Sequence, residues 1–382
     1  MKRILYWGLC AVALSCAHAA NPSPGSQPPP KAVPNLKLQP LKSPQDIRVD
    51  LQREEVFIHA DQTYESLLTH EKTLLTTRGL LNNQTLDSPS YFPGHTSVEL
   101  VEAYTLQPDG TKIDVPAANL FTTTSPADPS APGFVTSLQQ HVAFPQLKIG
   151  STLHVKWRYK QLDAPLFNFA DVISPPFETD SLRTEMAVNL PQSMYVKWTK
   201  SGDFQVKDTV EGDRHIISAV LGPQSGHKRE LFMPASSDLL PFFEVSTIRS
   251  WEEIGNTISQ LTLPSQTITP EIEKLAKTIV GNAKGKEAAR AIYNWTANNI
   301  AYLETEINPR QGIVPPSASE IIANRFGDCK AHSCVLQTLL KVIGIESYPA
   351  IINWDNSLKQ YPLPIVNFDH EMVFVPSLNL KL

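Results

Sequence analysis

Two residue types in the last quarter of the sequence have the clearest capacity for chemistry, a cysteine and a histidine. Cys329 follows Asp328 at the start of an expected helix over residues 329–343, where unpaired backbone N–H groups and the helix dipole favour a thiolate. His370, the last histidine of the sequence, lies on an expected strand over residues 368–375. A cysteine at the mouth of a helix with a histidine available as its base is the pattern of a nucleophilic thiol. We therefore expect Cys329 to be the nucleophile and His370 the base.

Other residues near Cys329 have weaker claims to a role. His332 lies one turn behind the sulfur on the same helix, a poor position for exchanging a proton with a substrate at the helix mouth. Gly327 would let the backbone approach closely and expose the sulfur. The peptide N–H of Cys329 is a candidate oxyanion donor. Cys334 points away from the helix mouth, and we expect it to be a small core residue.

The two cysteines are expected to remain unpaired and to bind no metal. If both lie on one helix, residues five apart have Cα atoms about 8.6 Å apart, beyond the roughly 7 Å that a disulfide can span. A metal site built from Cys329, His332, Cys334 and His370 is disfavoured, because the C-x2-H-x-C spacing spreads its ligands around the helix. We expect neither a metal nor another cofactor.

The first 19 residues are typical of a secretory signal peptide. Two basic residues precede an apolar run over residues 4–14 that is short for a membrane span, and residues 17–19 fit a small-residue cleavage site. A retained membrane anchor, or a lipoprotein anchored through Cys16, is a less favoured alternative. We expect a periplasmic or secreted protein with no membrane span after signal removal.

The remaining chain divides by composition. Its 382 residues suffice for two domains, and a net charge of −5 without a dense basic stripe argues against a nucleic-acid partner. Residues 20–45 are rich in proline and serine, as in a linker. Residues 46–245 show short strands between turn residues, which is typical of a β-sandwich-like domain. From Ser250 the pattern is helical, so we assign residues 246–382 to a second domain.

Individual elements follow from the hydrophobic period and from capping residues. We expect strands over residues 98–106, 111–115, 152–160, 194–198 and 215–220. In the second domain we expect helices that begin after Ser250 and Thr269, helices over residues 286–299, 317–325 and 329–343, and strands over 348–353 and 368–375. The strand that carries His370 is expected near a sheet edge, without a neighbour beyond it. Seven histidines of the first domain stand alone and are more typical of surface or structural positions: His59, His70, His95, His141, His154, His215 and His227.

Three segments of the second domain resemble the transglutaminase-like (papain-like) thiol enzymes of bacteria. Residues 324–330 (NRFGDCK) are similar to the cysteine helix of that superfamily, and residues 368–370 (FDH) begin a strand similar to its histidine strand. Residues 300–302 with Pro315 fit the stretch before the cysteine. The three segments occur in the expected order, and the resemblance covers residues from about 285 to the end.

The first domain is similar, more loosely, to an all-β domain of unknown function that often precedes this core in bacteria. The matching stretches are residues 99–110 and 144–150. The two resemblances imply an α+β fold class, with an N-terminal β-sandwich-like domain followed by a papain/transglutaminase-like α+β core. We expect this core to be incomplete at its C-terminus.

The resemblance also implies a Cys-His-Asp triad, in which His370 acts as base and then as acid. In the superfamily the aspartate heads the next strand, shortly after a segment like residues 378–382. The sequence given stops at Leu382 without it, so we expect a truncated or degenerate site. Asp355 in the intervening loop is an available carboxylate. Asp369, next to His370, is expected to point to the opposite strand face.

Two functions fit these residues. The first is an exported cysteine enzyme that acts on peptide or protein amides by acyl transfer, either cross-linking them or hydrolysing them. In it Tyr302 is a candidate oxyanion donor, against the alternative of a core tyrosine. The second is a non-catalytic module that binds a cell-envelope partner. In serine triads, loss of the orienting carboxylate can cost roughly 10⁴ in rate, which favours the second function for a site without that group.

Overall fold

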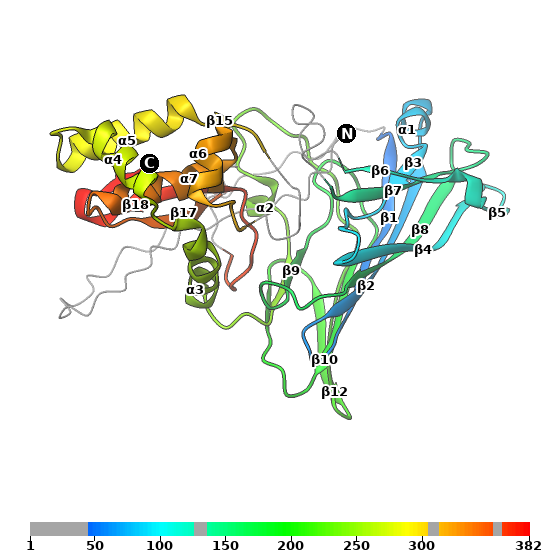
Figure 1. Ribbon diagram of the computed structural model, residues 1–382. Coiled ribbons are helices and arrows are strands. Elements are labelled where there is room, and N and C mark those ends of the chain that lie inside the picture. Colours follow the sequence, from blue (N-terminus) through cyan, green and yellow to red (C-terminus); the bar gives the residue numbers. More distant parts are fainter. Residues whose placement is uncertain (1–44, 126–135, 305–312, 354–360) are drawn as a thin grey trace.

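The computed structural model describes residues 45–125, 136–304, 313–353 and 361–382. The expected signal peptide, nearly all of the linker and Asp355 lie outside the described residues. Strands dominate as far as Ser246, and helices dominate from Trp251 onward (Figure 1). This order is the α+β class expected from the sequence.

An eight-stranded sheet is the largest element of the N-terminal part. Its order is β12-β13-β10-β1-β2-β8-β4-β5, and its strands pair antiparallel except for β1 with β10. The strands are β1 (Ile47–Ile58), β2 (Tyr64–Leu74), β4 (Thr96–Leu106), β5 (Lys112–Asp114), β8 (Thr152–Gln161), β10 (Thr184–Pro191), β12 (Gln205–Glu211) and β13 (Arg214–Leu221).

Two three-stranded sheets pack against the large sheet and make the arrangement sandwich-like. One has the order β3-β7-β6 and buries Val142 of β7 with Leu153 and Trp157 of β8. The other has the order β11-β14-β9 and buries Phe243 of β14 with Val188 of β10. Their strands are β3 (Thr85–Asp87), β6 (Leu120–Thr124), β7 (Leu138–Ala143), β9 (Ala170–Ile173), β11 (Lys197–Lys200) and β14 (Phe243–Ser246); the short helices here are α1 (Thr77–Asn82), η1 (Ala117–Asn119) and α2 (Ser236–Leu239).

Four of the five strands expected in this part are confirmed to within two residues at each end, as β4, β5, β8 and β13. The expectation of a strand over 194–198 was wrong by three residues at its start. The backbone N–H of Met194 donates to the carbonyl of Pro191 at 2.9 Å, so a turn occupies the positions before β11.

Two helices of the C-terminal part, α3 and α4, begin where Ser250 and Thr269 predicted them. Ser250 and Thr269 each accept a hydrogen bond from a backbone N–H three residues on, and Ser317 forms a capping box with Glu320. The helices are α3 (Trp251–Thr262), η2 (Leu263–Gln266), α4 (Pro270–Val280), α5 (Gly285–Asn299), α6 (Ala318–Asn324), α7 (Cys329–Val342) and η3 (Pro376–Leu378). Across the described ranges, no helix combines the length and apolar character needed to cross a membrane.

Helix α7 forms the centre of this part. Its side chains Val335, Leu339 and Leu340 are fully buried, and they pack with Val373 and Val375 of a small sheet. That sheet has the order β17-β18-β19, with β17 (Tyr348–Ile352), β18 (His370–Val375) and β19 (Leu380–Lys381), while β15 (Ala301–Tyr302) pairs separately with β16 (Phe326–Gly327). The helix is therefore held on several sides.

The expected edge position of the His370 strand was wrong. β18 is the middle strand, because β19 pairs with its C-terminal end through Phe374 opposite Lys381 and Val375 opposite Leu380. The chain turns back through η3, where Asn379 adopts a left-handed conformation with φ of 48°. The N-terminal end of β18, around His370 and Glu371, extends beyond the two residues of β19.

The two parts of the chain are joined by specific polar contacts. Ser246 donates from its hydroxyl to the carbonyl of Pro364 at 2.6 Å, and Asn168 donates to the Glu253 carboxylate at 2.8 Å. Ile248 and Ile254 are buried in a cluster that also receives Phe167 from the N-terminal part. The start of α3 is thus anchored to the β-rich part.

Gly327 makes the approach to α7 possible. A Cβ built on Gly327 would lie 2.3 Å from the Cβ of Ala331, in the first turn of the helix. We predict that Gly327→Ala lowers the free energy of unfolding by about 1–3 kcal/mol, because the helix start must shift to relieve the overlap. Urea denaturation measures the change. Gly222→Ala is the matched control, because a Cβ there meets nothing within 4 Å; equal effects of the two substitutions would contradict the prediction.

Candidate active site at Cys329

Asp328 fixes the start of the cysteine helix. One of its carboxylate oxygens accepts the backbone N–H of Ala331 at 3.1 Å, and the other lies 2.7 Å from the Lys330 ammonium. Both side chains are largely buried, at 6% and 17% exposure. Upstream, Arg325 ends α6 in a left-handed conformation with φ of 63°, which turns the chain into β16 and then into α7. The residue order of the GDCK motif thereby places Cys329 as the first residue of the helix.

The sulfur of Cys329 lies against β18, near the N-terminal end of this strand. The backbone N–H of Glu371 donates to this sulfur. Two residues on, the N–H of Val373 donates to the carbonyl of Leu382, beside β19. Alternate N–H groups of a strand point to the same edge, so the sulfur accepts a hydrogen bond at the edge of β18 to which β19 also pairs.

Tyr302 is the second donor to the sulfur. Its hydroxyl hydrogen-bonds Cys329, while the residue as a whole is 61% exposed. β15 holds it there by parallel pairing with β16, in which the N–H of Ala301 donates to the Arg325 carbonyl at 2.8 Å and that of Leu303 to the Gly327 carbonyl at 3.0 Å. The alternative of a core tyrosine is therefore wrong, and its hydroxyl lies beside the thiol.

Burial controls the protonation of the thiol. Cys329 is 9% exposed, and loss of solvent raises its pKa. The Lys330 charge and the N–H of Glu371 oppose this effect, whereas Asp328 and Glu371 add to it through their charges. The helix start therefore does not produce the thiolate-favouring environment expected from the sequence. The free protein holds a neutral thiol near pH 7.

His370 is the first residue of β18 and directly precedes Glu371, the residue whose N–H reaches the sulfur. Its ring is half-buried, and burial lowers its pKa. The negative charge of Asp369 partly opposes this effect and raises the pKa. The positive charge of Lys330 lowers the pKa further, and the negative charge of Asp328 raises it. Since the imidazole is neutral near pH 7, it is in the form that can accept a proton. Asp369, exposed to solvent, and Asp328 are the carboxylates that act on it.

Glu371 is the charged residue that sequence reasoning missed. It is buried at 7% exposure among the apolar residues of its strand face, Val373 and Val375. Burial raises the pKa of its carboxyl to about 8, against the opposing effects of Lys330 and a hydrogen bond with Ser333. The alternation of side chains along β18 could have indicated the burial of Glu371, because it puts this glutamate on the strand face that packs against α7.

Two further residues of α7 take different places. Cys334 is buried and free, and its thiol points to the carbonyl of Ser265 at 3.5 Å, as expected for a core cysteine. The ring of His332 lies between two backbone carbonyls, with Nδ1 2.9 Å from the oxygen of Asp328 and Nε2 3.1 Å from that of Ile300. As expected, this histidine is not directed at the helix mouth.

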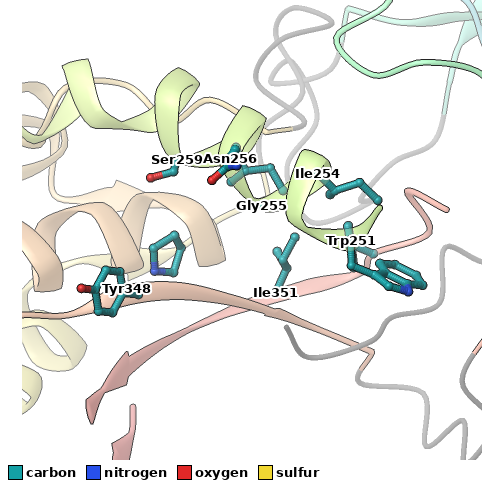
Figure 2. Close-up of a pocket in the computed structure, with 10 residues that line it drawn as sticks. Trp251, Ile254, Gly255, Asn256, Ser259, Tyr348 and Ile351 are labelled. Carbon is teal, nitrogen blue, oxygen red and sulfur yellow. The ribbon is translucent and has the colours of Figure 1, made fainter. Parts of the chain in front are cut away.

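An apolar cavity of about 80 Å³ lies between α3 and β17. Figure 2 shows Trp251 and Ile254 of the helix on one side and Ile351 of the strand on the other. Phe368, two residues before His370, completes the lining next to the histidine strand. Cys329 is not among the lining residues, so the cavity and the thiol are separate features of the same small sheet.

Two family models match the chain. A model of a domain of unknown function with solved structure (DUF3857) matches residues 60–221, and the model of the transglutaminase-like superfamily matches residues 273–360. Cys329 and Tyr302 lie inside the second match, and His370 lies beyond its end. No curated protein matches the chain.

Among solved structures, the chain is similar to a candidate protease from Parabacteroides distasonis, with a TM-score of 0.73 and 16% identity over 88% of this chain and 67% of that one. At this identity the similarity concerns the fold, which the two proteins share across both parts of the chain. An M1 zinc metallopeptidase from Deinococcus radiodurans has a TM-score of 0.29 and 10% identity over 53% of this chain and 42% of that one. This score is too low to indicate a shared fold.

Glu371 makes stability depend on pH. Its carboxyl has a pKa of about 8 in the folded chain against 4.5 for the ordinary group. Its contribution is therefore complete below pH 4.5 and is lost as the pH rises toward 8. We predict that Glu371→Gln reduces the fall in the free energy of unfolding between pH 5 and pH 8 by roughly 3–4 kcal/mol.

The measurement is urea denaturation across this pH range. Glu211→Gln, at an exposed position on β12, is the control and should leave the slope unchanged. Parallel curves for the wild type and Glu371→Gln would show that this carboxyl ionises normally.

Proposed function

We propose that this chain, in which a DUF3857 domain precedes a domain of the transglutaminase-like superfamily, is an exported cysteine enzyme that acts on amide bonds by acyl transfer. Cys329 is the nucleophile and His370 the base in this proposal. The observation that carries it is the convergence of two donors on one sulfur at a helix start: the Tyr302 hydroxyl and the Glu371 backbone N–H.

The protonation states define the first step. Because burial raises the pKa of Cys329 and lowers that of His370, the resting pair is a neutral thiol and a neutral imidazole. His370 removes the thiol proton as the sulfur attacks the amide carbonyl carbon. The peptide N–H of Cys329 and the Tyr302 hydroxyl are the candidate donors to the developing oxyanion.

The second step releases the amine and leaves an acyl group on the sulfur. The carbon–nitrogen bond breaks, the proton held by His370 passes to the departing amine, and a thioester of Cys329 remains. A second amine then takes the acyl group and forms a new amide, or water takes it and forms a carboxylic acid. In either case the thiol recovers its proton. The acceptor alone separates cross-linking from hydrolysis.

The substrate and the location remain part of the proposal. The superfamily favours an amide of a peptide or protein. The signal-like N-terminus favours the periplasm or the exterior, where components of the cell envelope supply such amides. Attachment through Cys16 is the less favoured alternative. We propose no cofactor for the reaction, since its electrophile and nucleophile are an amide and a thiol.

A second candidate function is a non-catalytic module that binds a cell-envelope partner. The burial of Cys329 favours it, since a thiol at 9% exposure with a raised pKa is a poor nucleophile until a base removes its proton. Both candidates can be tested on the same purified chain, because they differ in whether His370 acts on the thiol.

We predict that His370→Ala slows the alkylation of Cys329 by iodoacetamide at pH 7–8 by about tenfold, because it removes the base that assists the thiol. Labelling after removal of the signal residues is followed by mass spectrometry, which resolves Cys329 from Cys334. His95→Ala is the control, since this ring is surface-exposed and pairs with Asp163. Equal alkylation rates of Cys329 in the wild type and in His370→Ala would contradict the enzyme proposal and favour the binding module.

The pH profile of alkylation gives a second prediction. Burial lowers the pKa of His370 and Asp369 raises it in part, so the base is lost only below the ordinary value of 6.5. We predict that Asp369→Asn moves the acid limb of the profile to lower pH, because the variant removes a carboxylate that favours the imidazolium. The difference should shrink in 1 M salt, since Asp369 is exposed. A shift to higher pH would contradict the assignment of this limb to His370.

A further inference from the structure

His332 is a polar side chain that the proposed reaction does not use. Its two ring nitrogens face two backbone carbonyls on different elements. Nδ1 lies 2.9 Å from the backbone oxygen of Asp328, the N-cap of α7, and Nε2 lies 3.1 Å from that of Ile300, directly before β15. A neutral imidazole donates one of these hydrogen bonds and an imidazolium donates both. The Nε2 contact is the one that connects the cysteine helix to β15.

β15 needs such a connection because it is very short. It has two residues, and both are exposed. Its parallel pairing with β16 supplies two backbone hydrogen bonds, from Ala301 and Leu303. No strand lies on its other side in the 2-stranded sheet that the described residues form there. A strand of this length has little stability of its own.

Tyr302 is the residue that depends on the position of β15. Its ring lies beside that of His332, with centroids 5.6 Å apart and an angle of 34° between the rings. Its hydroxyl reaches the sulfur of Cys329, although the residue is 61% exposed. His332 therefore lies beside the ring of Tyr302 and also contacts the backbone carbonyl of Ile300, two residues before this tyrosine.

We propose that His332 is a positioning residue that keeps the Tyr302 hydroxyl on the sulfur of Cys329, by holding β15 against the cysteine helix through its bond to Ile300. The inference rests on the proposed function, because it assigns a role in supporting the same thiol. His332 takes no proton from the substrate in this account. It acts on the sulfur through Tyr302.

The test is a double-mutant cycle on the pKa of the Cys329 thiol, obtained from alkylation rate against pH, which needs no amide substrate. Tyr302→Phe removes a donor to the sulfur and should raise the thiol pKa by about one unit. His332→Leu should raise it by a similar amount. In the Tyr302→Phe background, His332→Leu should have little further effect.

Two conservative variants separate the bonds of His332. The amide of His332→Gln reaches about as far as Nε2 and can donate to Ile300, whereas that of His332→Asn reaches about as far as Nδ1. We expect Gln to restore most of the wild-type thiol pKa and Asn to resemble Leu. A folded Asn variant with an unchanged thiol pKa would overturn the proposal, as would additive shifts from His332→Leu and Tyr302→Phe. Thermal unfolding identifies variants that fail to fold. If His332→Leu does not fold, the comparison of the thiol pKa in His332→Gln and His332→Asn tests the proposal.

The outcomes also separate this inference from the proposed function. If His370→Ala leaves alkylation unchanged, the enzyme proposal fails whatever the His332 variants do. If His370→Ala slows alkylation but the shifts from His332 and Tyr302 are additive, the enzyme proposal stands and the positioning role of His332 is refuted.

Discussion

The structure around the thiol depends on one buried carboxylate, that of Asp328. It caps the first turn of α7 through Ala331 and neutralises the Lys330 ammonium at 2.7 Å. Removing it would leave Lys330 as an uncompensated buried charge, which is more costly than losing a surface ion pair. The same contacts set the direction in which α7 leaves β16, and so decide where the first side chain of the helix, that of Cys329, is placed.

The edge of β18 is the second constraint, and it follows from the first. Once α7 begins at Cys329, the sulfur lies beside Glu371 near the N-terminal end of β18. The backbone N–H of Glu371 donates to the thiol, which satisfies this polar group. This arrangement connects the cysteine helix to the strand on which His370 is the first residue.

The sequence predicted those features that local chemistry decides. Ser250 and Thr269 predicted the starts of their helices because an N-cap is a contact within four residues. The neighbour of β18 was not predictable in this way, because it depends on a left-handed turn at Asn379 after the strand. The raised pKa of Cys329 was also missed, since it arises from burial by tertiary packing that the capping pattern does not contain.

The balance of charge at the site explains how a buried thiol can still suit the proposed acyl transfer. Asp328 and Lys330 cancel one another, and Glu371, with a pKa of about 8, is neutral near pH 7. A free thiolate would add a negative charge to this buried cluster of side chains, and for this reason burial raises the pKa of Cys329. A thioester carries no charge and does not incur that cost. In the proposed reaction, negative charge appears mainly in the transition states, on oxygen and sulfur close to the candidate donors, the Tyr302 hydroxyl and the backbone N–H groups. Stabilising this charge more than the resting state is what would accelerate the reaction.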